Sequence, residues 1–213
     1  MKDFKKKTAF FPYIDQETMT FFSDVGFDVV YQEHDQYAAD VMVFTGGPDV
    51  TPFLYGQKKI KGTNCDPIRD LKERQIINSV DVSMPKIGIC RGAQFLNVYN
   101  GGMLWQDVDK HTSQHDAWDI DAPQSKFTVT STHHQMMQPT AWGKVLTVSQ
   151  NSTKRDDDIG SVTVGKNILD PEVVFYEMTN SLCVQYHPEH ANATRECRHH
   201  FWSTVDETLG KDI

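Results

Sequence analysis

A single cysteine lies where a short apolar segment passes into a glycine-rich one. Cys90 follows PKIGI and precedes RGAQFLNVYNGG, with Gly88 and Gly92 two residues to either side. A strand that turns sharply into a helix at such glycines exposes its side chain at the sheet edge, where the helix amides and dipole favour a thiolate. The segment therefore predicts a nucleophile at Cys90. A buried structural cysteine is an equal alternative when this segment is considered alone.

A candidate base and its acceptor lie near the other end of the chain, in the segment QYHPEH. A thiol nucleophile needs a base within hydrogen-bond reach, and that base needs an acceptor that orients it. His187 and Glu189 are two residues apart, so they point to the same side of an extended segment, and Pro188 stiffens the link between them. Together with Cys90, they predict a Cys90–His187–Glu189 relay.

The segment FTGGPDV could stabilise the negative charge that builds on a carbonyl oxygen during acyl transfer. Backbone N–H groups are the usual donors to such an oxyanion, and Gly46 and Gly47 let the main chain approach a ligand closely. We predict an oxyanion hole formed by the backbone N–H groups of Gly47 and of Arg91, the residue after Cys90. A plain β-turn is the alternative, because GGPD is also a turn sequence.

The elements that must position these residues alternate between strand and helix in the first half of the chain. The patterns predict strands at 8–15, 27–34, 39–47 and 85–90 and helices at 16–26, 66–82 and 92–102. Further strand signals at 126–134, 144–151, 173–180 and 182–189 precede a last helix at 192–208. This order predicts an α/β fold in a single domain, residues 1–213. Its sheet should be open and mostly parallel, with some antiparallel additions and flanking helices.

Such a sheet also explains how distant segments could form one site. Ligands of open α/β sheets bind beyond the carboxyl ends of the strands. TGG, CRG and HPE each follow a predicted strand, so we expect them to converge on one edge.

Composition and charge narrow the class of protein. The formal net charge of -8 argues against nucleic acid or an anionic membrane as the main partner, because both prefer a basic surface. No run approaches the ~18 apolar residues of a membrane span, and the apolar run after the basic N-terminal segment is too short for a signal peptide. The four cysteines match neither a zinc pattern nor a secreted disulfide framework. We therefore expect a cytoplasmic enzyme without a metal or cofactor.

These motifs together resemble the class I glutamine amidotransferase family, which has a flavodoxin-like fold and a Cys-His-Glu triad. GICRGAQFLNVYNGG is similar to the nucleophile motif of the family, TGGPDV to its oxyanion motif and VQYHPEH to its terminal motif. Finer details resemble the γ-glutamyl hydrolase branch, which includes γ-glutamyl-γ-aminobutyrate hydrolase. These details are TGGPDVTPFLYG, RDLKE at 69–73, Arg91, and STHHQM at 131–136.

The resemblance implies a reaction and a set of substrate contacts. Cys90 would attack the amide of glutamine or of a γ-glutamyl amine, release ammonia or an amine, and pass through a thioester that water hydrolyses. Gln94 matches a family position that holds the glutamyl group, and position i+4 of a helix lies on the face of the nucleophile. His133 and His134 match a loop that lines the same pocket, and Gly46 lies beside it.

Three functions remain open at this point. The chain could be a stand-alone γ-glutamyl amide hydrolase, a glutaminase subunit that supplies ammonia to a separate synthetase, or a binding module that kept the fold. It could also form a homo-oligomer. The complete triad argues against the binding module. The polar segment NSTKRDDDIGSVTVGKN matches no pocket element of the hydrolases, so the amine side of the substrate is undetermined.

A second histidine motif has the spacing of a metal site. His111 and His115 in HTSQH are four residues apart, as in helical zinc sites, but the sequence shows no third ligand. We therefore expect no metal there, and we place both histidines in a loop at the pocket rim.

Overall fold

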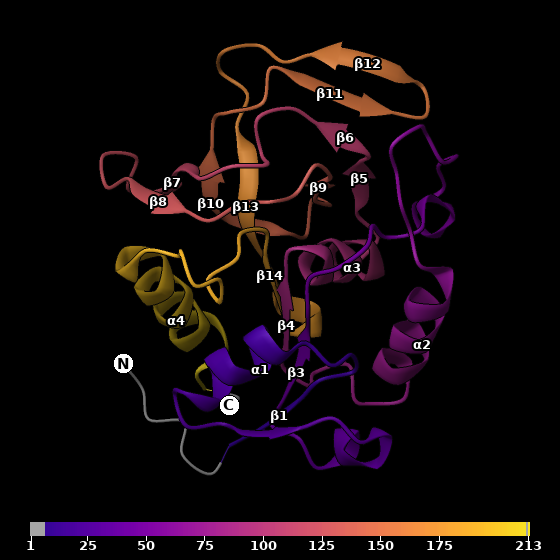
Figure 1. Cartoon of the computed structure of the whole chain (residues 1–213), viewed down its shortest axis with the longest axis vertical. Helices are drawn as coiled ribbons and strands as arrows, with labels where there is room; N and C mark the ends of the chain where they lie inside the picture. Colours follow the sequence, from indigo (N-terminus) through magenta and orange to yellow (C-terminus); the bar gives the residue numbers. More distant parts are fainter. Residues whose placement is uncertain (1–6, 212) are drawn as a thin grey trace.

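The central sheet begins with five parallel strands. In the computed structural model, which describes residues 7–211 and 213, a nine-stranded sheet has the order β2-β1-β3-β4-β14-β13-β10-β7-β8 (Figure 1). Its first five strands pair in parallel: β2 (Asp28–Val30), β1 (Thr8–Phe10), β3 (Val41–Phe44), β4 (Lys86–Ile89) and β14 (Ser181–Val184). Because they share a direction, the segments after β3, β4 and β14 leave the sheet at the same edge.

The rest of the sheet is antiparallel. It contains β13 (Asp170–Tyr176), β10 (Lys144–Ser149), β7 (His115–Asp119) and β8 (Phe127–Val129). The α/β fold with flanking helices is confirmed, and its large sheet is mixed. The antiparallel addition is larger than expected, with as many antiparallel as parallel strand pairs.

Helices cover both faces of the parallel strands. Helices α1 (Gln16–Ser23) and α4 (Arg195–Leu209) pack on one face, and α2 (Pro67–Asn78) and α3 (Arg91–Tyr99) on the other. A strand covered on both faces points successive side chains into opposite cores. In β3, Val41 and Val43 join the core under α1 and α4, and Met42 and Phe44 join the core under α2 and α3. No helix among the described residues combines the length and apolarity that crossing a membrane needs.

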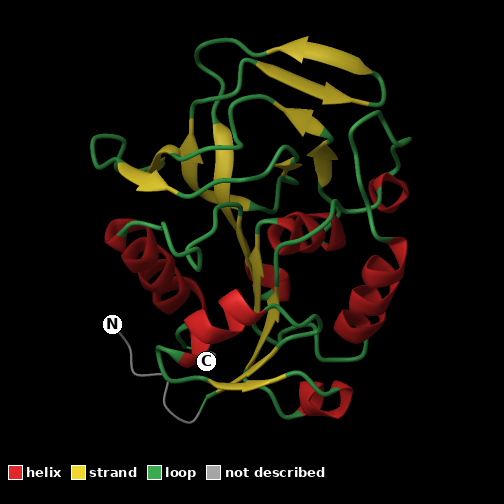
Figure 2. Cartoon of the chain, in the orientation of Figure 1, coloured by secondary structure: helices red, strands yellow, loops and turns green. Residues whose placement is uncertain are grey.

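Two smaller sheets lie beyond the parallel strands (Figure 2). One pairs β5 (Met103–Trp105) with β9 (Met136–Gln138) and adjoins helix α3, and the other joins β6 (Asp107–Val108), β11 (Lys154–Asp157) and β12 (Gly160–Thr163). Short 3-10 helices occur at η1 (Glu33–Tyr37), η2 (Pro52–Tyr55) and η3 (Glu177–Thr179). The polar segment that we could not assign to a pocket element is largely the β11–β12 hairpin.

Helix α2 has the predicted position but an unexpected inner face. Asp66 caps it by accepting hydrogen bonds from the backbone N–H groups of Ile68 and Arg69. The apolar spacing of Ile68 and Leu71 contributed to the helix prediction, yet both side chains are exposed. The helix buries Ile76, which belongs to the same predicted spacing, and Ile77. It also buries charged residues, including Arg69, because these have partners on the inner side of the helix.

Candidate functional site

Cys90 lies at a strained corner between β4 and α3. Its backbone has φ 52° and ψ −108°, a conformation that a residue with a Cβ adopts only when its surroundings enforce it. Gly88 and Gly92 allow this corner to close, because a Cβ on Gly88 would overlap the backbone of Gly92 and one on Gly92 would overlap the backbone of Phe44. The expected elbow is present, and only glycine fits on either side of it.

His187 and Glu189 follow β14 and interact directly. The ring Nδ1 of His187 lies 2.7 Å from Oε1 of Glu189, and the His187 backbone N–H donates to the carbonyl of Thr130. Burial by itself would lower the pKa of the His187 ring. The negative charge of a Cys90 thiolate and the hydrogen-bonded carboxylate of Glu189 outweigh burial and raise that pKa. The structure thus brings Cys90, His187 and Glu189 together.

A further histidine that sequence analysis missed packs on this ring. His190 stacks on His187 with a centroid separation of 4.1 Å and an interplanar angle of 11°. It follows Glu189 directly, so the HPEH segment gives three neighbouring polar groups.

The loop after β3 passes over the same place. A Cβ on Gly46 would lie 3.0 Å from Cε1 of His187 and 4.0 Å from Cβ of Cys90. Gly47 has φ +142°, which strongly favours glycine. Gly46 and Gly47 therefore lie where the main chain can contact a group bound to Cys90.

Four buried charged residues connect this loop to the nucleophile elbow, and we call them the α2 charge cluster: Arg69, Asp70, Glu73 and Arg91. Arg69 donates to the carbonyls of Thr45 and Gly46 at 3.0 and 2.8 Å, and its Nε donates to Glu73 at 2.9 Å. The Arg91 guanidinium is paired with both Asp70 and Glu73. All four side chains are at most 2% exposed. Two cations and two anions balance, which is the condition under which such charges are found in a core.

The segment RDLKE at 69–73 contains Arg69, Asp70 and Glu73 of this cluster. The signal was present, since Arg69 and Glu73 have the i,i+4 spacing of a helical ion pair. The apolar periodicity gave no sign that the charged residues of this helix are buried.

Most of the predicted site residues line one cavity of about 280 Å³, whereas Gly46 and Glu189 lie outside its lining. The structure adds Asp49, Thr132 and Gln135 to it. The lining residues are Gly47, Asp49, Cys90, Arg91, Gln94, Thr132, His133, His134, Gln135 and His187. Gln94 is one helical turn from Cys90, and its amide donates to the carbonyl of Gln135 at 2.9 Å. Residues of the loop after β3, of Cys90 and the start of α3, of the β8–β9 connection and of the segment after β14 thus meet at the carboxyl edge of the parallel strands.

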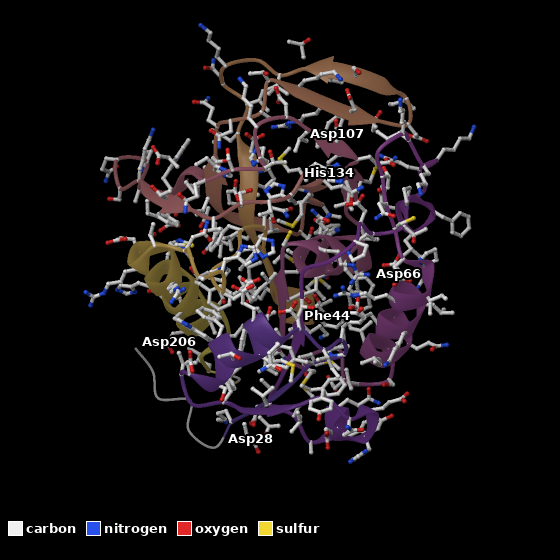
Figure 3. The ribbon with its side chains drawn as sticks, viewed as in Figure 1. Asp28, Phe44, Asp66, Asp107, His134 and Asp206 are labelled. Atoms are coloured by element: carbon white, nitrogen blue, oxygen red, sulfur yellow. The ribbon has the colours of Figure 1, made fainter. Side chains whose placement is uncertain are left out.

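The two histidines of STHHQ differ in charge at neutral pH. Burial, aided by nearby His111, lowers the pKa of His133 to about 3, and its Nδ1 donates to the carbonyl of Gln135. His134 lies between Asp49 and Asp107, with one ring nitrogen 3.1 Å from each carboxylate. Figure 3 labels His134 and Asp107. The hydrogen bond to Asp49 raises the pKa of His134 to about 9, with Asp107 adding to it. At neutral pH His133 is therefore neutral and His134 positively charged.

The HTSQH motif differs from its prediction in three ways. His111 is fully buried rather than at a rim, His115 begins strand β7, and Glu172 of β13 supplies the third ligand that the sequence did not reveal. His115 Nε2 lies 2.8 Å from Oε1 of Glu172, which also accepts from the hydroxyl of Ser149. These hydrogen bonds account for the arrangement of His115 and Glu172 without an ion. His187, Glu189 and His190 form a second group with metal-compatible spacing, but Nδ1 of His187 is paired with Glu189. The expected absence of a metal stays a prediction.

Comparisons with known proteins identify relatives of this chain. The chain is 30% identical over 206 residues to a glutamine amidotransferase-like protein, YvdE of Lactococcus lactis, covering 83% of this chain and 80% of the relative. It is also 30% identical over 176 residues to protein NtpR of Enterococcus hirae, covering 70% of this chain and 66% of that protein.

Solved structures share the fold at low identity. A glutamine amidotransferase from Thermotoga maritima superposes with a TM-score of 0.59 at 13% identity, over 96% of this chain and 84% of that one. A Thermoplasma acidophilum protein described as a GMP synthase subunit gives a TM-score of 0.66 at 14% identity, over 96% and 95% of the two chains. These likenesses show the fold alone. The sequence profile of the peptidase C26 family matches residues 31–189, and the chain therefore belongs to this family of glutamine amidotransferase-like proteins.

Proposed function

We propose that this protein hydrolyses a γ-glutamyl amide, either glutamine or a γ-glutamyl amine, through a thioester on Cys90, as in the γ-glutamyl hydrolase branch. The observation that carries the proposal is that His187, hydrogen-bonded to Glu189, lines the same small cavity as Cys90. The family match makes amide hydrolysis the expected chemistry.

In the proposed first step, the Cys90 thiolate attacks the γ-carbonyl carbon, and the carbonyl electrons move to its oxygen. Protonated His187 then gives its proton to the leaving nitrogen, the C–N bond breaks, and ammonia or an amine departs. The raised pKa of His187 supports this role, because it keeps the ring protonated beside a thiolate. Glu189 fixes the ring and stabilises its positive charge.

In the second step, His187 takes a proton from water as the water attacks the thioester. Glutamate leaves and the Cys90 thiolate is restored, so no other reactant is consumed. In both steps the backbone N–H groups of Gly47 and Arg91 stabilise the oxyanion. The N-terminal end of α3 favours the same negative charge.

The remaining cavity residues hold the glutamyl group in this proposal. Neutral His133 offers an acceptor at Nε2 for a donor of the substrate, because its Nδ1 already donates to Gln135. His134 lies on the cavity wall, where Asp107 and Asp49 hold its two ring nitrogens, and we assign it to the shaping of that wall. Gln94 and Gly46 complete the contacts. The four cysteines are free, which supports the cytoplasm as the place of action.

A turnover assay with the purified chain tests the proposal. Ammonia, amine and glutamate release would be measured for free glutamine and for a panel of γ-glutamyl amines, with Cys65→Ser as a matched cysteine control. Steady turnover of at least one substrate, retained in Cys65→Ser, is expected. Turnover of γ-glutamyl amines with glutamine ignored identifies a stand-alone hydrolase. Feeble glutaminase activity that rises with an added synthetase identifies the ammonia-supplying alternative. No turnover under any of these conditions contradicts the proposal.

A further inference from the structure

We propose that Arg69 is a positioning residue that holds the oxyanion hole in its active geometry within the chain, so that hydrolysis needs no partner protein. This inference rests on the hydrolysis proposed above and adds how the site is kept ready. It assigns a role to the α2 charge cluster, whose charges take no part in the chemical steps.

The orientation of the Gly46–Gly47 peptide bond decides where the N–H of Gly47 points. The Gly46 carbonyl accepts a hydrogen bond from Nη1 of Arg69 at 2.8 Å. The described peptide bonds are all trans, so the N–H of Gly47 points away from that carbonyl and away from Arg69. Gly47 lines the cavity of Cys90 and His187, and Gly46 packs against both. The bond to Arg69 thus selects the orientation in which the Gly47 N–H can serve an oxyanion.

The opposite orientation of this peptide is disfavoured by the same residue. A rotated Gly46–Gly47 peptide would lose the Arg69 bond and turn an N–H toward a guanidinium that has no acceptor to offer. Space is also restricted, because a Cβ on Gly47 would overlap Nη1 of Arg69. Arg69 therefore both holds the peptide and fills the volume behind it.

The guanidinium is itself fixed on several sides. Nη2 donates to the carbonyl of Thr45 at 3.0 Å and to its hydroxyl at 3.1 Å, while Nε donates to Glu73 at 2.9 Å. The ring of Tyr13 lies over its carbon at 4.1 Å. Because Glu73 and Tyr13 lie outside the glycine loop, they hold the guanidinium in place independently of it.

The same cluster also positions the second oxyanion donor. The backbone N–H of Arg91 is the proposed partner of Gly47, and the Arg91 side chain is paired with Asp70 and Glu73. Asp70 in turn accepts a hydrogen bond from the backbone N–H of Thr51 at 2.9 Å, at the far end of the glycine loop. Both donors are therefore fixed to helix α2 of the same chain, which is why we infer a hole that is formed before any partner binds.

Substitution of Arg69 tests the inference. In Arg69→Gln, kcat for a γ-glutamyl amide should fall ~10²–10³-fold, as when one oxyanion donor is lost. KM and the inhibition constant of glutamate, which report binding without an oxyanion, should change less than ~3-fold. Arg69→Lys keeps the charge but cannot serve Thr45, Gly46 and Glu73 together, so we expect a smaller, roughly 10-fold loss in kcat. Arg74→Gln, an exposed arginine of the same helix, is the matched control and should behave like the wild type.

The outcomes separate this inference from the function on which it rests. If the wild-type chain turns over substrate and folded Arg69→Gln retains kcat within ~3-fold, the positioning role is wrong and the proposed hydrolysis stands. The positioning role is also wrong if glutamate inhibition weakens as much as kcat falls, because the pocket as a whole is then disturbed. If Arg69→Gln does not fold, an unchanged kcat in Arg69→Lys overturns the inference. If the purified wild-type chain is active only with a partner, partner independence is wrong. If it is inactive under every condition, the proposed function fails first.

Discussion

The two faces of the parallel sheet are packed with different kinds of side chain. The face under α1 and α4 is a core of aromatic rings, in which Phe22 contacts Trp202 edge-to-face at 5.1 Å between centroids. The face under α2 carries an apolar core as well, but beside it lies the α2 charge cluster. Aromatic packing needs only volume and shape, whereas paired charges fix the direction of each hydrogen bond. The comparison suggests that one face supplies stability and the other holds the site in position.

The largest loss of activity should come from replacing the nucleophile, while the packing of both faces stays unchanged. Cys90→Ser is nearly isosteric, so the free energy of unfolding should stay within ~0.5 kcal/mol of the wild type. Hydrolysis should fall by ~10³-fold or more, because a hydroxyl is a far weaker nucleophile in this setting. Amine release and chemical denaturation would be measured on the same preparation. Full activity in this variant would remove Cys90 from the mechanism.

Matched substitutions on the two faces should then separate stability from turnover. Phe22→Ala removes a fully buried ring and should lower the free energy of unfolding by about 3–5 kcal/mol. Glu73→Gln removes the charge that pairs with both Arg69 and Arg91, and should cost a similar ~3–5 kcal/mol.

Only the second variant should also slow the reaction. We expect kcat per folded molecule to be unchanged in Phe22→Ala and reduced in Glu73→Gln, measured at a temperature where both are folded. Equal kcat in the two variants would show that the faces do not differ in function.

Replacing Glu189, which orients the His187 ring, should slow turnover less than replacing His187, which transfers the proton. Glu189→Gln should slow turnover about 10²-fold, and removal of the His187 imidazole by His187→Gln about 10³–10⁴-fold, because the carboxylate only holds and stabilises the ring. Steady-state kinetics of the two variants would be compared at one pH. A loss in Glu189→Gln that equals or exceeds the loss in His187→Gln would contradict the assigned roles.

The smallest effect should be a pH-dependent contribution from His134, outside both faces. Its pKa is raised by Asp49 and Asp107 to about 9 in the folded chain. The stabilisation is therefore complete below an unfolded pKa of about 6.5 and is lost as the pH rises from there toward 9. Because the ring is 34% exposed, solvent screening limits it to about 1 kcal/mol. Denaturation of the wild type and His134→Gln at pH 6 and pH 9.5 should show a difference that shrinks at the higher pH, and a difference that grows would reverse the sign.

The sequence was most informative where strands are apolar and where glycines mark turns. The parallel strands, the four helices and the meeting of TGG, CRG and HPE follow from apolar runs and from the shared edge of parallel strands. The segment KRDD of β11 has no apolar alternation, and its pairing with β12 and β6 depends on distant partners. The inner face of α2 was missed for a related reason, because Arg69 and Glu73 are buried only through charges supplied by Arg91 and the loop after β3.

The most direct test of this account is covalent labelling of the purified chain with a glutamine analogue that carries a diazoketone at the γ-carbon. The reagent needs a reactive thiolate and a glutamyl pocket, and peptide mass spectrometry identifies the residue that it modifies. We predict modification of Cys90 without any added protein, together with loss of activity and a slower rate in Arg69→Gln. Modification of another cysteine, or a Cys90 that reacts only when a second protein is present, would contradict the account.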